Sequence, residues 1–185
     1  MKKLFILLTV FLIGFTLSAQ DLNVNKSKLK WTGKKVTGEH WGYIDLKSGT
    51  LTLKSDKITG GTFTIDMNSL VCEDLESPEW NQKLVGHLKS DDFFSVDKFP
   101  VATLKIKEST SFKNGEAEVK ADLTIKGITE EIMFKAKKVD DTFTASITVD
   151  RTKYDVRYGS GKFFDNLGDN MIYDDFTLDV KIVTE

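Results

Sequence analysis

The sequence predicts an all-β fold, an antiparallel barrel of about eight strands with one short helix. Apolar and polar residues alternate with a period of two over many segments, which is typical of strands that have one dry and one solvated face. Turn-forming residues separate these segments, and only one segment has the spacing of an amphipathic helix. A closed barrel is favoured because closure leaves no exposed sheet edge, and a β-sandwich is the main alternative.

Residues 1–19 predict a secretory signal peptide, and residues 20–185 predict a single β-barrel domain. Lys2 and Lys3 precede the apolar run Leu4–Leu17, and small residues suited to cleavage follow it. This run of about 14 residues is shorter than the roughly 20 that a membrane-spanning helix needs. We therefore expect a periplasmic or secreted protein with no stable membrane span after signal cleavage.

The charge of the chain disfavours one class of function, and its cysteine content excludes an internal disulfide. The net charge of −2 becomes −4 when Lys2 and Lys3 are removed, and both signs are interspersed, which disfavours nucleic-acid binding. Cys72 is the single cysteine and cannot form an internal disulfide, so we expect a small buried residue there. The fold must then be held together by its core alone.

The clearest strand covers residues 116–126, where apolar and polar side chains alternate without a break. Further segments share this period, with the last three of them weaker: Phe63–Met67, Ile132–Ala136, Phe143–Val149, Phe176–Ile182, Leu29–Trp31, Trp41–Leu46 and Leu51–Leu53. Five residue pairs are expected to form the turns between strands: Ser48-Gly49, Gly60-Gly61, Asn114-Gly115, Lys126-Gly127 and Asp140-Asp141.

One helix is predicted near residues 78–89. Ser77 suits the N-cap and Pro78 suits the first helical position. An apolar stripe at i, i+4 and i+8 follows, made by Trp80, Leu84 and Leu88.

Three phenylalanines come after this helix in a polar segment, at Phe93, Phe94 and Phe99. Burying each of them is worth about 1.5–3 kcal/mol, so they must pack against another part of the chain. We expect this segment to close one end of the sheet. The inward faces of the strands mix phenylalanines with alanines, which favours an internal cavity over a barrel filled with its own side chains.

Three polar groups are candidates for chemistry. His87 with Asp91 and Asp92 could form an acid–base or metal cluster, but a metal site usually needs three or four converging ligands, and His40 is far away in sequence. A structural role for His87 is favoured.

The acidic segment 165–175 does not have the spacing of an EF-hand loop. Arg151 and Arg157 could contact the polar head of a ligand, although pairing with aspartates is the commoner use. We therefore expect no metal and no cofactor.

The segments His87–Phe94 and Lys98–Thr103 resemble the signature of the YceI-like family. Asp122–Thr129 and Asp150–Tyr154 agree with it, and the similarity follows the mature chain in order. The resemblance implies an extended, lipocalin-like barrel of eight antiparallel strands whose apolar tunnel takes an isoprenoid-type chain, often in a homodimer. It supplies no catalytic residues. Ser95 departs from the family pattern, in which an aspartate is frequent.

We therefore predict a periplasmic, non-enzymatic binding or carrier protein for an apolar chain: a polyisoprenoid, an isoprenoid quinone or a fatty-acyl lipid. The alternative is an enzyme acting on a lipid or small molecule with His87 and Asp91 as its acid–base pair. A third possibility is a filled barrel that acts only in protein contacts. Candidate wall residues are Phe63, Ile65, Met67, Leu104, Ile106, Leu123, Ile125, Phe134, Phe143, Ile147, Phe176 and Leu178. Candidates for the mouth or cap are Trp41, Trp80, Leu84, Phe94, Phe99 and Phe163.

Overall fold

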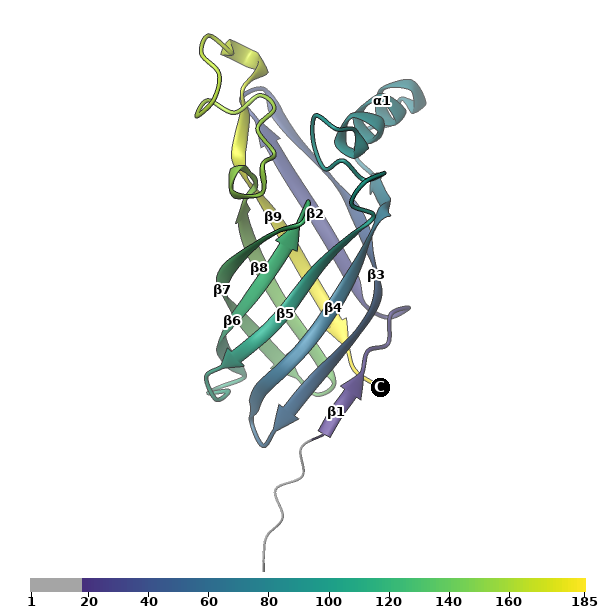
Figure 1. Ribbon diagram of the computed structural model, residues 1–185. Helices are drawn as coiled ribbons and strands as arrows, with labels where there is room; N and C mark the ends of the chain where they lie inside the picture. The colour runs from purple at the N-terminus through teal and green to yellow at the C-terminus, as the bar shows by residue number, and fades with distance from the viewer. Residues whose placement is uncertain (1–17) are drawn as a thin grey trace, which may run out of the picture.

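The computed structural model describes residues 18–185, and these form one closed antiparallel barrel (Figure 1). Hydrogen-bonded neighbours follow the order β1-β3-β2-β9-β8-β7-β6-β5-β4, and pairing of β3 with β4 closes an eight-stranded ring. The short strand β1 pairs with β3 outside this ring. The strands are β1 (Ser18–Asp21), β2 (Lys28–Lys35), β3 (Gly38–Lys54), β4 (Lys57–Cys72), β5 (Val101–Ser109), β6 (Glu116–Ile125), β7 (Ile128–Val139), β8 (Thr142–Asp150) and β9 (Ile172–Val183). The prediction of an eight-stranded antiparallel barrel is confirmed, and a sandwich is excluded.

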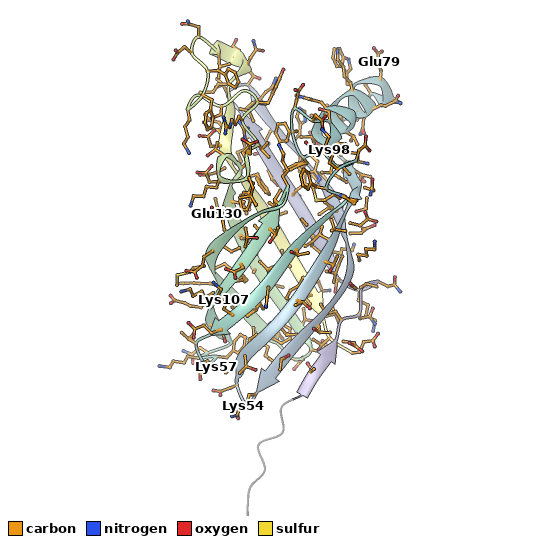
Figure 2. All side chains as sticks on the ribbon, viewed as in Figure 1. Lys54, Lys57, Glu79, Lys98, Lys107 and Glu130 are labelled. Carbon is orange, nitrogen blue, oxygen red and sulfur yellow. The ribbon has the colours of Figure 1, made fainter. Side chains whose placement is uncertain are left out.

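Strand β6 shows how the alternating pattern builds the wall. Val119, Ala121 and Leu123 are 1%, 0% and 5% exposed and face the interior. The residues between them face the outside of the barrel, as does Lys107 of β5 (Figure 2). The Lys107 ammonium lies 2.8 Å from the carboxylate of Asp122 and 3.1 Å from that of Glu131. Such exposed ion pairs add little stability, so burial of the inward face is what fixes this register.

Two of the expected turns have the backbone that tight hairpins need. Residues Asn114 and Gly115 have φ angles of 53° and 79°, and Lys126 and Gly127 have 51° and 74°. Both pairs therefore form two-residue turns with positive φ at each position, as predicted. Asp140 also has a positive φ, of 52°, between β7 and β8.

Two other expected turns are wrong. Ser48-Gly49 lies inside β3 and Gly60-Gly61 inside β4, and the chain reverses instead at Ser55, which has a φ of 54°. A Cβ on Gly49 would lie 2.7 Å from the carbonyl oxygen of Thr62, so glycine is needed there because two bent strands approach closely. The weaker segments Trp41–Leu46 and Leu51–Leu53 consequently belong to one strand of 17 residues.

The helix α1 (Pro78–Lys89) begins and ends where the sequence predicts, with Pro78 in its first turn. It lies over one end of the barrel, beside the segment that leads into β5 (Figure 1). Among residues 18–185, no helix is long and apolar enough to cross a membrane. Two short 3-10 helices, η1 (Arg151–Tyr154) and η2 (Gly168–Asn170), lie in the connection from β8 to β9.

The predicted signal peptide lies largely outside the described residues. Its expected end falls within β1, where Ala19 pairs with Thr52 and Gln20 pairs with Leu51 of β3. Cleavage at that point would leave β3 with only the last part of this partner strand.

Candidate functional site

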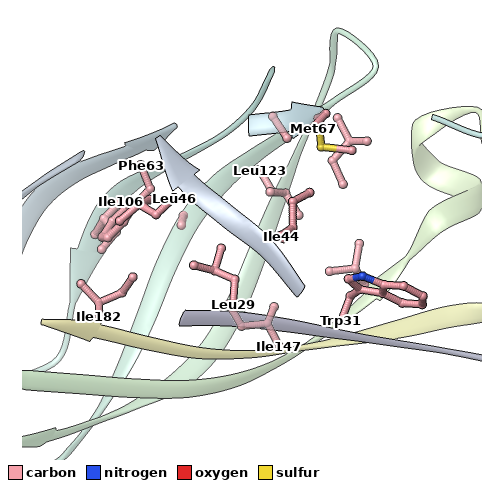
Figure 3. Packing of buried hydrophobic residues seen from close by; sticks show 14 of the residues in the cluster. Leu29, Trp31, Ile44, Leu46, Phe63, Met67, Ile106, Leu123, Ile147 and Ile182 are labelled. Atoms are coloured by element: carbon pink, nitrogen blue, oxygen red, sulfur yellow. The ribbon is translucent and has the colours of Figure 1, made fainter. Parts of the chain in front are cut away.

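The interior of the barrel contains a cavity of about 320 Å³. It extends from Ile58 and Ile182 near one end to His87 and Arg151 at the other. Figure 3 shows inward-pointing side chains from several strands around this space, among them Leu29, Trp31 and Ile147. The phenylalanines of the inward faces therefore do not fill the barrel.

The structure places all twelve candidate wall residues on the cavity surface, together with two of the mouth candidates. Their binding role stays a prediction. These residues are Phe63, Ile65, Met67, Leu84, Phe94, Leu104, Ile106, Leu123, Ile125, Phe134, Phe143, Ile147, Phe176 and Leu178.

Several lining residues of β2, β3 and β4 were missed, including Leu29, Trp31, Ile44, Leu46, Leu51 and Ile58. The alternation of Leu29 with Trp31, and of Ile44 with Leu46, is the signal that could have found them. A turn at Ser48-Gly49 would divide β3 into two strands. With that turn predicted, the sequence did not show which side chains in the second half of β3 point into the barrel.

Trp41 and Trp80 do not line the cavity. Trp41 lies on the outer face of β3, at 6.0 Å from the ring of Tyr43 and under the ammonium group of Lys30. Trp80 is 57% exposed because the first turn of α1 extends beyond the barrel wall (Figure 1).

Phe99 and Phe163 are also absent from the cavity wall. Phe99 packs over the β6–β7 turn, where a Cβ on Gly127 would lie 3.1 Å from its ring. Phe163 is 44% exposed, and the guanidinium carbon of Arg157 lies 5.0 Å from its ring centroid. A position outside the regularly alternating strands does not determine where a side chain points, so the prediction that these four aromatic residues line the mouth is not supported by their placement.

Phe93 and Phe94 do cover one end of the cavity. The Phe93 ring is 6% exposed and lies 5.2 Å from that of Phe94, which lies 6.2 Å from the Phe176 ring of β9. These edge-on contacts add to the gain from burial. The segment after α1 thus packs onto the barrel end as expected.

Arg151 is the buried cation at this end, with a side chain 2% exposed. Its Nε, Nη1 and Nη2 donate to the carbonyl oxygens of Tyr173, Val156 and Ile172 at 3.1, 2.7 and 3.1 Å. Burial lowers the pKa of the guanidinium, and nearby Asp174 partly offsets this. The three backbone contacts make Arg151 a brace for the β8–β9 connection that also touches the cavity.

Beside it, Asp150 organises the start of η1. Its carboxylate accepts the Thr152 N–H at 2.9 Å and the Lys162 ammonium at 3.0 Å. Burial alone would raise the pKa of Asp150, but the hydrogen bonds from Thr152 and Lys162 outweigh it and lower that pKa. Arg157 pairs with Asp155 at 2.7 Å, so both arginines are engaged within the protein.

His87 and Asp91 are not brought together. His87 lines the cavity, and its ring lies 4.4 Å from Tyr158 and 5.8 Å from Phe93, both edge-on. The Asp91 carboxylate, 67% exposed, accepts the Lys98 ammonium at 2.7 Å and does not line the cavity. The acid–base pair required by the enzymatic alternative is therefore not formed.

A second polar cluster joins His40, Cys72 and Asp74, which sequence reasoning did not connect. His40 Nδ1 lies 2.8 Å from Asp74 Oδ2, and the Cys72 thiol donates to Asp74 Oδ1 at 3.2 Å. Burial raises the pKa of the Cys72 thiol, with the Asp74 contact adding to it. Burial would raise the pKa of Asp74 as well, but hydrogen bonds from the Trp41 N–H and His40 lower it overall. Pairing of Gly42 with Cys72 brings the three residues together.

Several solved structures share this architecture. BcnA of Burkholderia cenocepacia superposes with a TM-score of 0.70 at 21% identity, covering 89% of this chain and 100% of that one. A polyisoprenoid-binding domain of Saccharophagus degradans gives 0.61 at 15% identity, over 92% and 99% of the two chains. The YceI protein of Campylobacter jejuni gives 0.53 at 17% identity, over 100% and 93%. At these identities the comparison concerns the fold alone.

Relatives by sequence match shorter stretches. A UPF0312 protein of Vibrio cholerae is 41% identical over 51 residues, which cover 28% of this chain and 27% of that protein. A UPF0312 protein of Staphylococcus aureus is 36% identical over 84 residues, covering 40% and 46%. The alignments thus span less than half of either relative. The YceI-like domain model, in contrast, matches residues 21–184, so the chain belongs to the YceI-like family.

Proposed function

We propose that this protein binds an apolar chain, a polyisoprenoid, an isoprenoid quinone or a fatty-acyl lipid, inside its barrel without transforming it. The observation that carries the proposal is the cavity of about 320 Å³, whose wall is made almost entirely of aliphatic and aromatic side chains. This volume lies in the range of small-molecule binding pockets. Family membership and the fold shared with the polyisoprenoid-binding domain of Saccharophagus degradans support the same class of ligand.

The energetics favour a greasy ligand over a polar one. Each buried CH₂ group contributes about 0.8 kcal/mol, so a chain needs few polar contacts for useful affinity. A polar molecule would lose its hydration without replacement along Leu123, Phe134 and Ile147.

The polar lining groups gather mainly at the α1 end of the barrel. Lys34, Lys35 and His87 lie there, with Arg151 and Asp175 nearby. In the proposed complex the apolar tail occupies the barrel and a polar end group stays beside these residues. The polar side chains at this end of the cavity would then determine which end group binds, and the length of the cavity would determine which chain length fits.

Binding is favoured over catalysis because the described acid–base candidates do not converge. Asp91 pairs with Lys98 on the surface, and Arg151 is engaged by three backbone carbonyls. The cavity wall therefore supplies contacts for a chain, and no activated nucleophile is formed by the pair that the enzymatic alternative requires.

Export to the periplasm or beyond, and a homodimeric state, belong to the same proposal. The apolar segment Leu4–Leu17 supports export. Mass determination of the protein from a periplasmic extract tests the cleavage, and light scattering coupled to gel filtration tests the dimer.

Ligand class is tested on protein stripped of lipid under mild conditions and refilled with a chain series. We expect fatty acids and prenyl alcohols of increasing length to raise the melting temperature progressively until the cavity is full. They should also displace the fluorescent fatty acid cis-parinaric acid. A flat response to every chain length, with no displacement, would reject an apolar-chain ligand.

A further inference from the structure

The cluster His40–Cys72–Asp74 combines a nitrogen, a sulfur and an oxygen ligand, the donor set that zinc-like ions prefer. One donor atom from each residue lies within 4.8 Å of the other two. Around one tetrahedral zinc ion, such donors are separated by about 3.4–3.6 Å, given zinc–ligand distances of about 2.0–2.3 Å. In the structure His40 Nδ1 lies 2.8 Å from Asp74 Oδ2, and Cys72 Sγ lies 3.2 Å from the other oxygen of the same carboxylate, Oδ1. Small side-chain movements would bring the three donor atoms to the separations that an ion requires.

The backbone holds these side chains in place. Gly42 lies opposite Cys72 in the β3–β4 ladder, and a Cβ on Gly42 would meet the Val71 carbonyl oxygen at 1.9 Å. This close approach brings the end of β4 against the start of β3. Glu73 N–H then donates to the Trp41 carbonyl oxygen at 2.9 Å, which sets the position of the next residue, Asp74.

The carboxylate of Asp74 is already oriented as a ligand. Its Oδ1 accepts the Trp41 N–H at 2.8 Å, which leaves Oδ2 directed at His40. A hydrogen bond from the backbone to a ligating carboxylate is a usual support in metal sites. The cluster thus has three donor atoms and a backbone hydrogen bond that supports the carboxylate of Asp74.

Burial and access are also those of a metal site. The Cys72 residue is 5% exposed, while the side chains of His40 and Asp74 are 32% and 20% exposed. The thiol is shielded, and an ion has a solvent path past the imidazole. His40 also lines the end of the cavity, so the cluster adjoins the proposed ligand site without lying inside it.

We propose that His40 Nδ1, Cys72 Sγ and Asp74 Oδ2 bind one zinc-like divalent cation, with water as the fourth ligand. Binding replaces the thiol proton, which is released to solvent, and the thiolate then neutralises part of the ion's charge. The proton that His40 Nδ1 donates to Asp74 moves to Nε2 as the imidazole changes tautomer, which frees the Nδ1 lone pair for the ion. This proposal does not depend on the nature of the apolar ligand.

Metal binding would also tie α1 to the barrel. Asn81 of α1 donates to the carbonyl oxygens of Cys72 and Leu75 at 2.8 and 3.2 Å. The cluster therefore lies at the attachment of the helix that covers the cavity. We expect the bound ion to protect this attachment from proteolysis and amide exchange.

The test is calorimetric titration of the metal-free protein with zinc alone, for the wild type and for the variants Cys72→Ser and His40→Gln. We expect one saturable site in the wild type and an affinity lower by roughly 100-fold or more in each variant. His87→Gln removes the other histidine and should bind zinc as the wild type does. Equal zinc affinity in all four proteins, or no saturable binding, would overturn the proposal.

A second measurement needs no variant and so does not depend on variant folding. Cobalt added to the wild-type protein should give the near-ultraviolet charge-transfer band of a cobalt–thiolate bond and the visible spectrum of a four-coordinate ion. Zinc should abolish both. A cobalt spectrum with no thiolate band would exclude Cys72 as a ligand and reject the site as drawn.

Discussion

The guanidinium carbon of Arg151 lies 5.4 Å from the centroid of the Phe93 ring. This contact joins the connection after β8 to the segment after α1, two parts of the chain that together cover one end of the barrel (Figure 1). A buried guanidinium above an aromatic face contributes both charge and packing. The end of the cavity is therefore closed by contacts that the alternating strand pattern does not encode.

Replacing Arg151 with methionine should destabilise the protein by about 3 kcal/mol, because three backbone carbonyls lose their donor. Urea unfolding measures the loss. Proteolysis should become faster within residues 155–171, the segment that Arg151 braces. Arg157→Met is the matched control: its side chain is 59% exposed, and the change should be within about 0.5 kcal/mol. Equal stabilities for the two variants would contradict the bracing role.

Gly42→Ala should destabilise the barrel by about 3 kcal/mol, because the added Cβ would lie 1.9 Å from the carbonyl oxygen of Val71. The strands β3 and β4 would have to separate at their end. Gly33→Ala is the matched control, since a Cβ there would meet nothing within 4 Å, and its effect should stay below about 1 kcal/mol. Thermal unfolding of both variants decides this, and a Gly42→Ala protein as stable as Gly33→Ala would show that the close approach is not required.

Tyr154→Phe tests a buried hydroxyl. Tyr154 is 1% exposed, and its hydroxyl has no hydrogen-bond partner among residues 18–185. Removing the hydroxyl should therefore leave stability at neutral pH unchanged or raise it by about 1 kcal/mol. A loss of more than about 1 kcal/mol would mean that the hydroxyl has a partner.

The same residue gives a pH prediction. Burial raises the pKa of Tyr154 to about 12, from its ordinary value of 10.0, with the charges of Glu130 and Asp150 adding to it. As the pH rises, the Tyr154 hydroxyl therefore loses its proton in the unfolded chain before it does so in the folded protein. The contribution of this hydroxyl to the free energy of unfolding is complete below about pH 10. On the order of 2 kcal/mol should be lost as the pH rises from about 10 to about 12. Tyr154→Phe should remove this part of the pH dependence, whereas Tyr158→Phe, at an exposed tyrosine, should keep it.

The barrel could be predicted because the alternation of apolar and polar residues shows which face of each strand is buried. Ala121 and Leu123 face inward and Lys120 outward because any other register would bury charge. The two-residue turns at Asn114-Gly115 and Lys126-Gly127 were also predictable, since each contains a glycine, which tolerates positive φ. At these positions, the conformation that the residue types favour is also the one that the barrel requires.

The course of β3 and β4 was not predictable in the same way. Gly49 and Gly61 have the composition of a turn, but their small size serves the close packing of two bent strands, which is a tertiary property. For the same reason, the cluster of His40 with Asp74 could not be read from residues 34 positions apart. Strand pairing creates that neighbourhood, and a single sequence does not state which strands pair.

The central claim, an apolar chain held inside the barrel, is tested most directly by native mass spectrometry of the protein as isolated. The wild type should carry additional mass from a lipid-soluble molecule. Ala136→Phe puts a ring into the cavity wall, while Met133→Phe adds the same ring on the outer face of β7, where Met133 is 68% exposed. We expect Ala136→Phe to lose the bound mass and Met133→Phe to keep it. A wild-type protein without bound lipid, or an unchanged load in Ala136→Phe, would contradict the proposed function.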